Sequence, residues 1–269
     1  MTQLNLIKTG SLHLCNYKML KFEGDIKKVE ALLQGQVTSD ITELANKSAQ
    51  LSCILDHKGF VQADFILLRS NDEIFAIIEN SLEANFRDQL KDFIKFYKVE
   101  INSCDLSVTG IVSKANNESY KNYIFYKDKQ YELSLCFDES KEIKSDKKLT
   151  ELDWKVANKL LLNYLFTIED INKYRPNEIN YDKSRVSFTK GCYRGQEIVA
   201  RVHHLGVNRR EFVTVLAPLD HNIDTNVKIH GEVLELNDVK IFSTNFIRED
   251  IKNNCIPEPL KLIRIQDSN

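Results

Sequence analysis

The sequence predicts an α+β protein, in which helices and antiparallel strands occur in separate runs rather than in strict alternation. Consecutive β-patterned stretches are joined by short polar turns, which favours hairpins. Apolar residues at helical spacing follow three residues suited to helix capping, Asp25, Ser81 and Thr150. Short alternating stretches then return in the last quarter of the chain. The first three candidate strands are residues 51–56, 60–68 and 73–79.

The first predicted helix begins after Asp25, whose carboxylate can accept hydrogen bonds from free backbone N–H groups. Gly35 is placed to end it. This helix would deliver Gln34 and Gln36 to a loop. Its apolar positions are Ile26, Val29, Leu32 and Leu33.

Asp64 stands out in the predicted strand 60–68. Side chains alternate between the two faces of a strand, so Asp64 shares its face with Ile66 and Leu68. A carboxylate in apolar surroundings needs partners, because burial penalises its ionised form. The alternative is an edge strand, where Asp64 simply meets water.

The remaining elements are predicted from the same patterns. Ser81 precedes an amphipathic helix, and Thr150 with Asp153 matches a capping box for another helix, in which the sole tryptophan, Trp154, is predicted to pack in the core. The hydrophilic run 138–148 is predicted to be a solvated connection and a domain boundary. Further candidate strands are residues 106–113, 121–126, 130–136, 211–217, 226–234, 238–247 and 259–265.

Composition excludes several classes of protein. The 269 residues carry a net charge of −2, so no global basic field favours non-specific nucleic-acid binding. No stretch approaches the roughly 18 apolar residues of a membrane span, and the start lacks a signal-peptide pattern, which predicts a cytoplasmic protein. Six scattered cysteines contain no Cys-x-x-Cys pair. Reduced thiols are therefore expected, without a zinc or Fe–S ligand set.

The octet Lys190–Glu197, KGCYRGQE, concentrates chemical groups on a loop shaped by two glycines. Cys192 lies two residues from both Lys190 and Arg194, and nearby positive charge favours a reactive thiolate. The alternative is that Cys192 is a small buried apolar residue. Glu197 either pairs with a ligand or is a first-turn acid of the next helix.

The octet and its flanks resemble the signature of the YgfZ-type folate-binding proteins, which are relatives of the aminomethyltransferase (T-protein) of the glycine cleavage system. Members of this group are described as tRNA-modifying proteins and Fe–S cluster assembly factors. An amino-terminal block agrees, in the same order along the chain. The flanking residues are 176–181, 186–188, 200–201 and 209–210, and the amino-terminal block is 32–40, 55–59 and 63–65.

The resemblance implies a fold and a domain organisation. The expected fold is T-protein-like, with ferredoxin-like α/β subdomains around a central folate site and a small C-terminal β-barrel. An N-terminal folate-binding-type α+β domain would span residues 1–140. A second α/β segment carrying the octet would span 141–205, and the barrel 206–269.

The resemblance also implies a site for tetrahydrofolate or a derivative. Cys192 and Lys190 are the predicted catalytic residues. The predicted folate-binding residues are Asp64, Glu178, Tyr193, Gln196, Glu197 and Arg201. Ala63 departs from the T-protein pattern, which has an acidic pair where this chain has only Asp64. No metal is predicted, because His203 and His204 have no nearby Cys or Asp to complete a ligand set.

The function implied is a folate-binding accessory factor, rather than a classical transferase, that supports Fe–S cluster assembly or repair and thereby tRNA modification. Its expected partners are folate, Fe–S assembly proteins or Fe–S client enzymes, and tRNA. One alternative is an active folate-dependent aminomethyl or one-carbon transferase. A second alternative is a tRNA-binding module that uses Lys190, Arg194, Arg201, Arg209 and Arg210.

Overall fold

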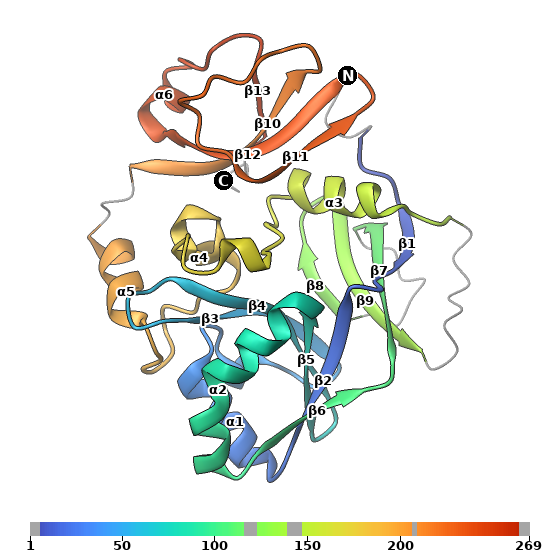
Figure 1. The fold of residues 1–269 in the computed structure, drawn as a ribbon, viewed down its shortest axis with the longest axis vertical. Coiled ribbons are helices and arrows are strands. Elements are labelled where there is room, and N and C mark those ends of the chain that lie inside the picture. Colours follow the sequence, from blue (N-terminus) through green and yellow to red (C-terminus); the bar gives the residue numbers. More distant parts are fainter. Residues whose placement is uncertain (1–5, 116–122, 139–146, 206–208, 264–269) are drawn as a thin grey trace.

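The structure is a computed structural model that describes residues 6–115, 123–138, 147–205 and 209–263. It contains three antiparallel sheets (Figure 1). The central sheet has the strand order β3-β4-β5-β2-β6, the second sheet β1-β7-β9-β8, and the C-terminal sheet β11-β12-β10-β13. Neighbouring strands within each sheet are antiparallel. This arrangement agrees with the predicted α+β class.

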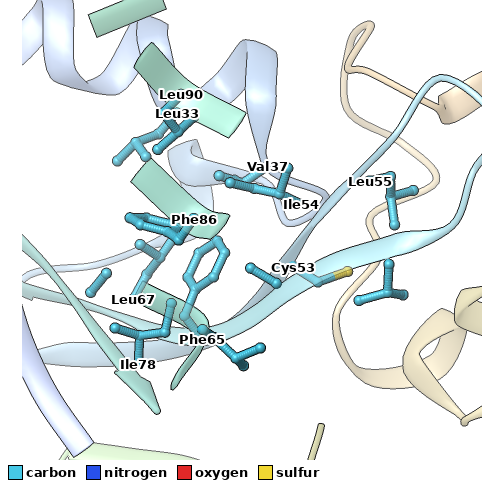
Figure 2. Packing of buried hydrophobic residues seen from close by; sticks show 14 of the residues in the cluster. Leu33, Val37, Cys53, Ile54, Leu55, Phe65, Leu67, Ile78, Phe86 and Leu90 are labelled. Carbon is cyan, nitrogen blue, oxygen red and sulfur yellow. The ribbon is translucent and has the colours of Figure 1, made fainter. Parts of the chain in front are cut away.

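The central sheet has helices α1 (Ile26–Gln36) and α2 (Glu83–Tyr97) on one face. Figure 2 shows how α2 inserts Phe86 and Leu90 above Phe65 of β4 and Ile78 of β5. The Phe65 and Phe86 rings meet edge to face, with centroids 4.9 Å apart. The strands of this sheet are β2 (Tyr17–Glu23), β3 (Ser48–Leu55), β4 (Val61–Ser70), β5 (Glu73–Glu79) and β6 (Glu100–Cys104).

Local sequence signals explain where α1 begins but not where it ends. Asp25 Oδ1 accepts hydrogen bonds from the backbone N–H groups of Lys27 and Lys28, which confirms the predicted cap. The helix runs through Gly35 to Gln36, so the expectation that Gly35 ends it is wrong. No Cβ contact would constrain position 35, and its glycine is therefore not required for a turn.

A second core joins the other face of the central sheet to the second sheet and α3 (Glu151–Leu160). Thr150 and Asp153 form the predicted capping box of α3. Trp154 packs in this core, and a Cβ at Gly110 would lie 2.7 Å from its ring, so the strand needs glycine there. The strands of the second sheet are β1 (Gly10–His13), β7 (Ser107–Lys114), β8 (Tyr123–Lys127) and β9 (Tyr131–Asp138).

The C-terminal sheet encloses a small core of its own together with α6 (Arg248–Lys252), and α3 lies between this sheet and the second sheet (Figure 1). Its described strands form one four-stranded sheet, so the predicted barrel is not confirmed. The predicted domain boundaries stay predictions, and most of the connection 138–148 lies outside the described residues. The strands are β10 (Arg210–Pro218), β11 (His230–Leu236), β12 (Val239–Ile247) and β13 (Lys261–Ile263).

Two short helices complete the described chain, α4 (Tyr181–Ser184) and α5 (Gln196–His204). α4 lies between the central sheet and the C-terminal sheet, and α5 lies beside the turn between β3 and β4 (Figure 1). Among the described residues, no helix combines the length and the apolar character that a membrane crossing requires.

Candidate functional site

Asp64 is partnered, which is the first of the two interpretations that the sequence left open. Arg185, which follows α4, donates from Nε to Oδ1 at 2.8 Å and from Nη2 to Oδ2 at 3.2 Å. The hydroxyl of Tyr181 donates to Oδ2 at 2.6 Å. β4 pairs with β3 at Asp64 and with β5 from Phe65 onward, and the side chain of Asp64 is only 14% exposed. The water-exposed alternative is therefore wrong.

Arg185 is the important residue that sequence reasoning missed. Its guanidinium lies 3.7 Å from the centroid of the Tyr181 ring, and its Nη2 also donates to Asn163 Oδ1 at 2.9 Å. Burial alone would lower the pKa of Arg185, but the neighbouring Asp64 carboxylate outweighs it and raises the pKa. The sequence offered only a weak signal, because Arg185 is one of two cations, with Lys183, between the motif blocks 176–181 and 186–188.

A cavity of about 710 Å³ opens beside this pair. It is bordered by α3, by residues 162–174, by the turn between β1 and β2, and by the C-terminal sheet. Its volume falls in the range of small-molecule sites. Its aromatic lining residues are Tyr17, Trp154, Tyr164, Phe166, Tyr174 and Phe212.

A small pocket of about 30 Å³ adjoins the cavity and contains Asp64 and Arg185. Trp154, Asn163 and Phe166 line both spaces. The Asp64–Arg185 pair therefore lies next to the cavity. An aromatic lining with a few polar groups suits a flat heteroaromatic ring, which can stack on the rings and exchange hydrogen bonds at its edge.

The octet forms a separate structure on the hairpin between β3 and β4. Nζ of Lys190 donates to the carbonyls of Val37 and Ser39, at 2.8 Å each. Burial lowers the pKa of Lys190 to about 8, against a weaker opposite effect of Asp40. Lys190 thus anchors the start of the octet to the chain that follows α1.

Gly195 fixes the other end of the octet. Its φ is +80°, and a Cβ there would lie 2.4 Å from the carbonyl oxygen of Asp56. Arg194 reaches the same hairpin, donating from Nε to the Leu55 carbonyl at 2.8 Å and from Nη2 to Gln89. The loop is therefore held tightly against the central sheet.

The other predicted octet residues divide between core and surface. Cys192 is exposed, so the structure excludes the buried alternative. Tyr193 is 7% exposed and belongs to the main core. Gln196 and Glu197 begin α5, where Glu197 is the first-turn acid. None of these residues lines the cavity.

Glu178 and Arg201 also lie outside the lining of the cavity. Glu178 ends a 3₁₀ turn, Pro176–Glu178, and its Oε2 accepts from the backbone N–H of Arg175 at 2.8 Å. Arg201 is exposed on α5. The structure thus places Asp64 beside the cavity and the octet elsewhere.

The adjacent histidines of α5 take part in ring contacts. His203 stacks on Phe188 with centroids 3.7 Å apart, and His204 meets His203 edge to face. Within the described ranges, no cluster of three or more His, Cys, Asp or Glu side chains has a geometry that could hold a metal ion.

Comparison with known sequences finds relatives below 30% identity, and no family model matches the chain. The tRNA-modifying protein YgfZ of Vibrio atlanticus is 26% identical over 220 residues, covering 74% of this chain and 67% of that protein. The YgfZ protein of Escherichia coli O139:H28 is 25% identical over 276 residues, covering 88% and 84%. An uncharacterized protein of Haemophilus influenzae is 28% identical over 203 residues, covering 74% and 70%.

Comparison with solved structures identifies the fold. The crystal structure of glycine cleavage system aminomethyltransferase T from Bartonella henselae matches with a TM-score of 0.60 and 11% sequence identity. The match covers 91% of this chain and 80% of that one. At this identity the likeness concerns the fold alone. The chain is thus similar in sequence to YgfZ proteins and similar in fold to an aminomethyltransferase T.

Proposed function

We propose that this protein binds tetrahydrofolate or a derivative in the cavity and supports Fe–S cluster assembly or repair, and through it tRNA modification. The observation that carries the folate part is the aromatic cavity of about 710 Å³ next to the buried Asp64–Arg185 pair, in a protein with the aminomethyltransferase T fold. The link to tRNA modification rests on the similarity to the YgfZ relatives, which are named as tRNA-modifying proteins.

Of the three predicted carboxylates, Asp64, Glu178 and Glu197, Asp64 is the best placed to contact a pterin ring. An ionised carboxylate has about four lone-pair sites, so Asp64 can accept ligand N–H groups besides those of Arg185 and Tyr181. Glu178 already caps its own 3₁₀ turn and does not line the cavity. In this proposal Glu178 supports the local backbone.

The geometry favours binding over aminomethyl transfer. Ala63 faces the core beneath α1 and α2, so only Asp64 of the T-protein acidic pair has a counterpart. Arg185 also engages both Asp64 oxygens. Amine activation needs a positioned proton acceptor, and this carboxylate is committed to a cation instead.

Cys192 is proposed to act at the surface, apart from the cavity. Lys190 and Arg194 hold the octet by hydrogen bonds to backbone carbonyls, and the thiol itself is exposed. An exposed thiol on such a loop can ligate the iron of a transferred cluster, or attack the outer sulfur of a partner's persulfide while the partner's thiolate leaves. Tyr193, Gln196 and Glu197 would then shape this loop rather than contact folate.

A direct tRNA-binding module is the less favoured alternative. Lys190 and Arg194 are engaged within the protein, which removes two of its five predicted cations. Arg201 and Arg209 remain exposed. Affinity for tRNA that falls steeply with salt and does not respond to folate would favour this alternative.

A complementation assay tests the role of the thiol. Cells that lack the protein would receive the wild type, Cys192→Ala or Cys255→Ala, and the product of an Fe–S tRNA-modifying enzyme would be measured. Cys255 is a matched control because it is also an exposed free cysteine. We expect Cys255→Ala to restore the product and Cys192→Ala to fail. Full restoration by Cys192→Ala would contradict the thiol role. Folate binding in the cavity is tested separately, by calorimetric titration of the protein with tetrahydrofolate.

A further inference from the structure

Lys159 lies near the end of α3 and lines the cavity. The proposed function assigns it no role. Its Nζ donates to the backbone carbonyl of Glu232 at 2.8 Å. Its own carbonyl accepts from Thr214 Oγ1 at 2.7 Å, which fixes this end of the helix against β10. The amine is therefore held at the boundary between α3 and the C-terminal sheet.

Lys159 has no carboxylate partner within ion-pairing distance among the described residues. The nearby acids are engaged elsewhere. Oε1 of Glu232 lies 3.1 Å from Lys155, and Oδ2 of Asp170 accepts from Tyr164 and Thr167. A partly buried ammonium without a counter-ion is unfavourable, and an anionic group entering the cavity would relieve this.

The charges around Lys159 support the same conclusion. Burial lowers its pKa to about 8, and the positive charge of Lys155 acts in the same direction. Glu232 and Asp170 oppose the shift without cancelling it. At neutral pH the amine of Lys159 is therefore protonated in most molecules, so it can bind a carboxylate.

The two cavities place this amine apart from the Asp64–Arg185 pair. Lys159 lines only the large cavity, whereas Asp64 lines only the small pocket that adjoins it, and Trp154 and Asn163 border both. An elongated ligand could therefore place a flat ring toward Asp64 and an anionic group toward Lys159. The aromatic side chains that line the cavity would contact the rest of the ligand.

We propose that Lys159 binds a carboxylate of the cavity's ligand and so selects flat heteroaromatic compounds that carry an acidic tail. The assignment rests on the proposed folate function, in which the anionic group is the glutamyl carboxylate of tetrahydrofolate. Lys159 is then a specificity-determining residue, and Lys155, paired with Glu151 and Glu232, is not.

The test compares two ligands by calorimetric titration: tetrahydrofolate, and 6-methyltetrahydropterin, which has the ring but no carboxylate. The proteins are the wild type, Lys159→Met, Lys159→Arg, and Lys252→Met as a control at an exposed lysine that does not line the cavity. We expect Lys159→Met to weaken tetrahydrofolate binding about tenfold or more, as the loss of a charged hydrogen bond does. Binding of the pterin should not change, Lys159→Arg should keep most of the affinity, and Lys252→Met should resemble the wild type.

A second readout is the proton exchanged on binding, measured in buffers of different ionisation enthalpy near pH 8.5. A bound carboxylate favours the charged amine, so the wild type should take up protons and Lys159→Met should not. Unchanged tetrahydrofolate affinity in Lys159→Met would overturn the assignment while the folate function stands. Equal wild-type affinity for the two ligands would do the same. Failure of both ligands to bind the wild type would overturn the folate function and this assignment together.

Discussion

Arg185 clamps the carboxylate of Asp64 with two hydrogen bonds although the residues are 121 positions apart in the chain. The side chain of Arg185 is 2% exposed and that of Asp64 is 14% exposed. The pair therefore ties β4 of the central sheet to the segment that leads into the octet. Because the pair also lines the small pocket beside the cavity, a change to either residue affects both the stability of the fold and this pocket.

Asp64→Asn is expected to destabilise the protein by about 3 kcal/mol, because it leaves the buried Arg185 charge without its counter-ion. The free energy of unfolding in urea measures this. The double variant Asp64→Asn, Arg185→Met should recover part of the loss, since it removes the uncompensated charge. A single variant as stable as the wild type would show that the pair contributes little. Because Asp64 variants are expected to be less stable, their folate affinities should be interpreted together with their unfolding free energies.

Lys190→Met and Cys192→Ala should differ sharply in stability although the residues are neighbours in the octet. Lys190→Met leaves the buried carbonyls of Val37 and Ser39 without a donor, at a cost of about 2 kcal/mol. Cys192 is exposed, and its replacement should change the unfolding free energy by less than about 0.5 kcal/mol. Urea unfolding of both variants checks this. Equal losses would contradict the positioning role of Lys190.

The two glycines of the octet offer a matched pair of substitutions. Gly195→Ala places a Cβ 2.4 Å from the Asp56 carbonyl at a φ of +80°, so it should cost about 2 kcal/mol or more. No atom lies within 4 Å of a Cβ at Gly191, and Gly191→Ala should be nearly neutral. Thermal melting compares them. A melting temperature for Gly195→Ala as high as that for Gly191→Ala would refute the described loop geometry.

His230 makes stability depend on pH. Burial, with the positive charges of Lys228 and Lys159, lowers its pKa from 6.5 to about 4. Below pH 6.5 the unfolded chain binds a proton that the folded chain does not bind until about pH 4. Stability is therefore lost as pH falls through this window, by up to about 3 kcal/mol.

The measurement is the difference in unfolding free energy between pH 7 and pH 5. His230→Gln should shrink this difference, whatever it does to stability at pH 7, whereas His57→Gln at an exposed position should leave it unchanged. An identical pH difference in the wild type and His230→Gln would contradict the assignment.

Features determined by neighbouring residues were predictable from the sequence. The Asp25 cap, the Thr150–Asp153 capping box and the alternation in β4 depend on local spacing, and the structure confirms each. The end of α1 was not predictable from Gly35 alone, because no left-handed residue is used there.

Features that depend on distant contacts were not predictable in the same way. The partner of Asp64 comes from 121 residues away. Nothing in the sequence distinguishes Lys190 from an exposed lysine. The fold buries its side chain against two backbone carbonyls that precede it by about 150 residues. The cavity needs α3, residues 162–174 and the C-terminal sheet together, and no local pattern marks it.

The most direct test of the account is calorimetric titration of tetrahydrofolate into the reduced protein, its Cys15→Trp variant and its Cys255→Trp variant. Both cysteines are exposed, but only Cys15 lines the cavity, so only Cys15→Trp should obstruct it. We expect the wild type and Cys255→Trp to bind alike and Cys15→Trp to bind at least about tenfold more weakly. Absence of binding in the wild type, or equal affinity in all three proteins, would contradict a folate site in this cavity.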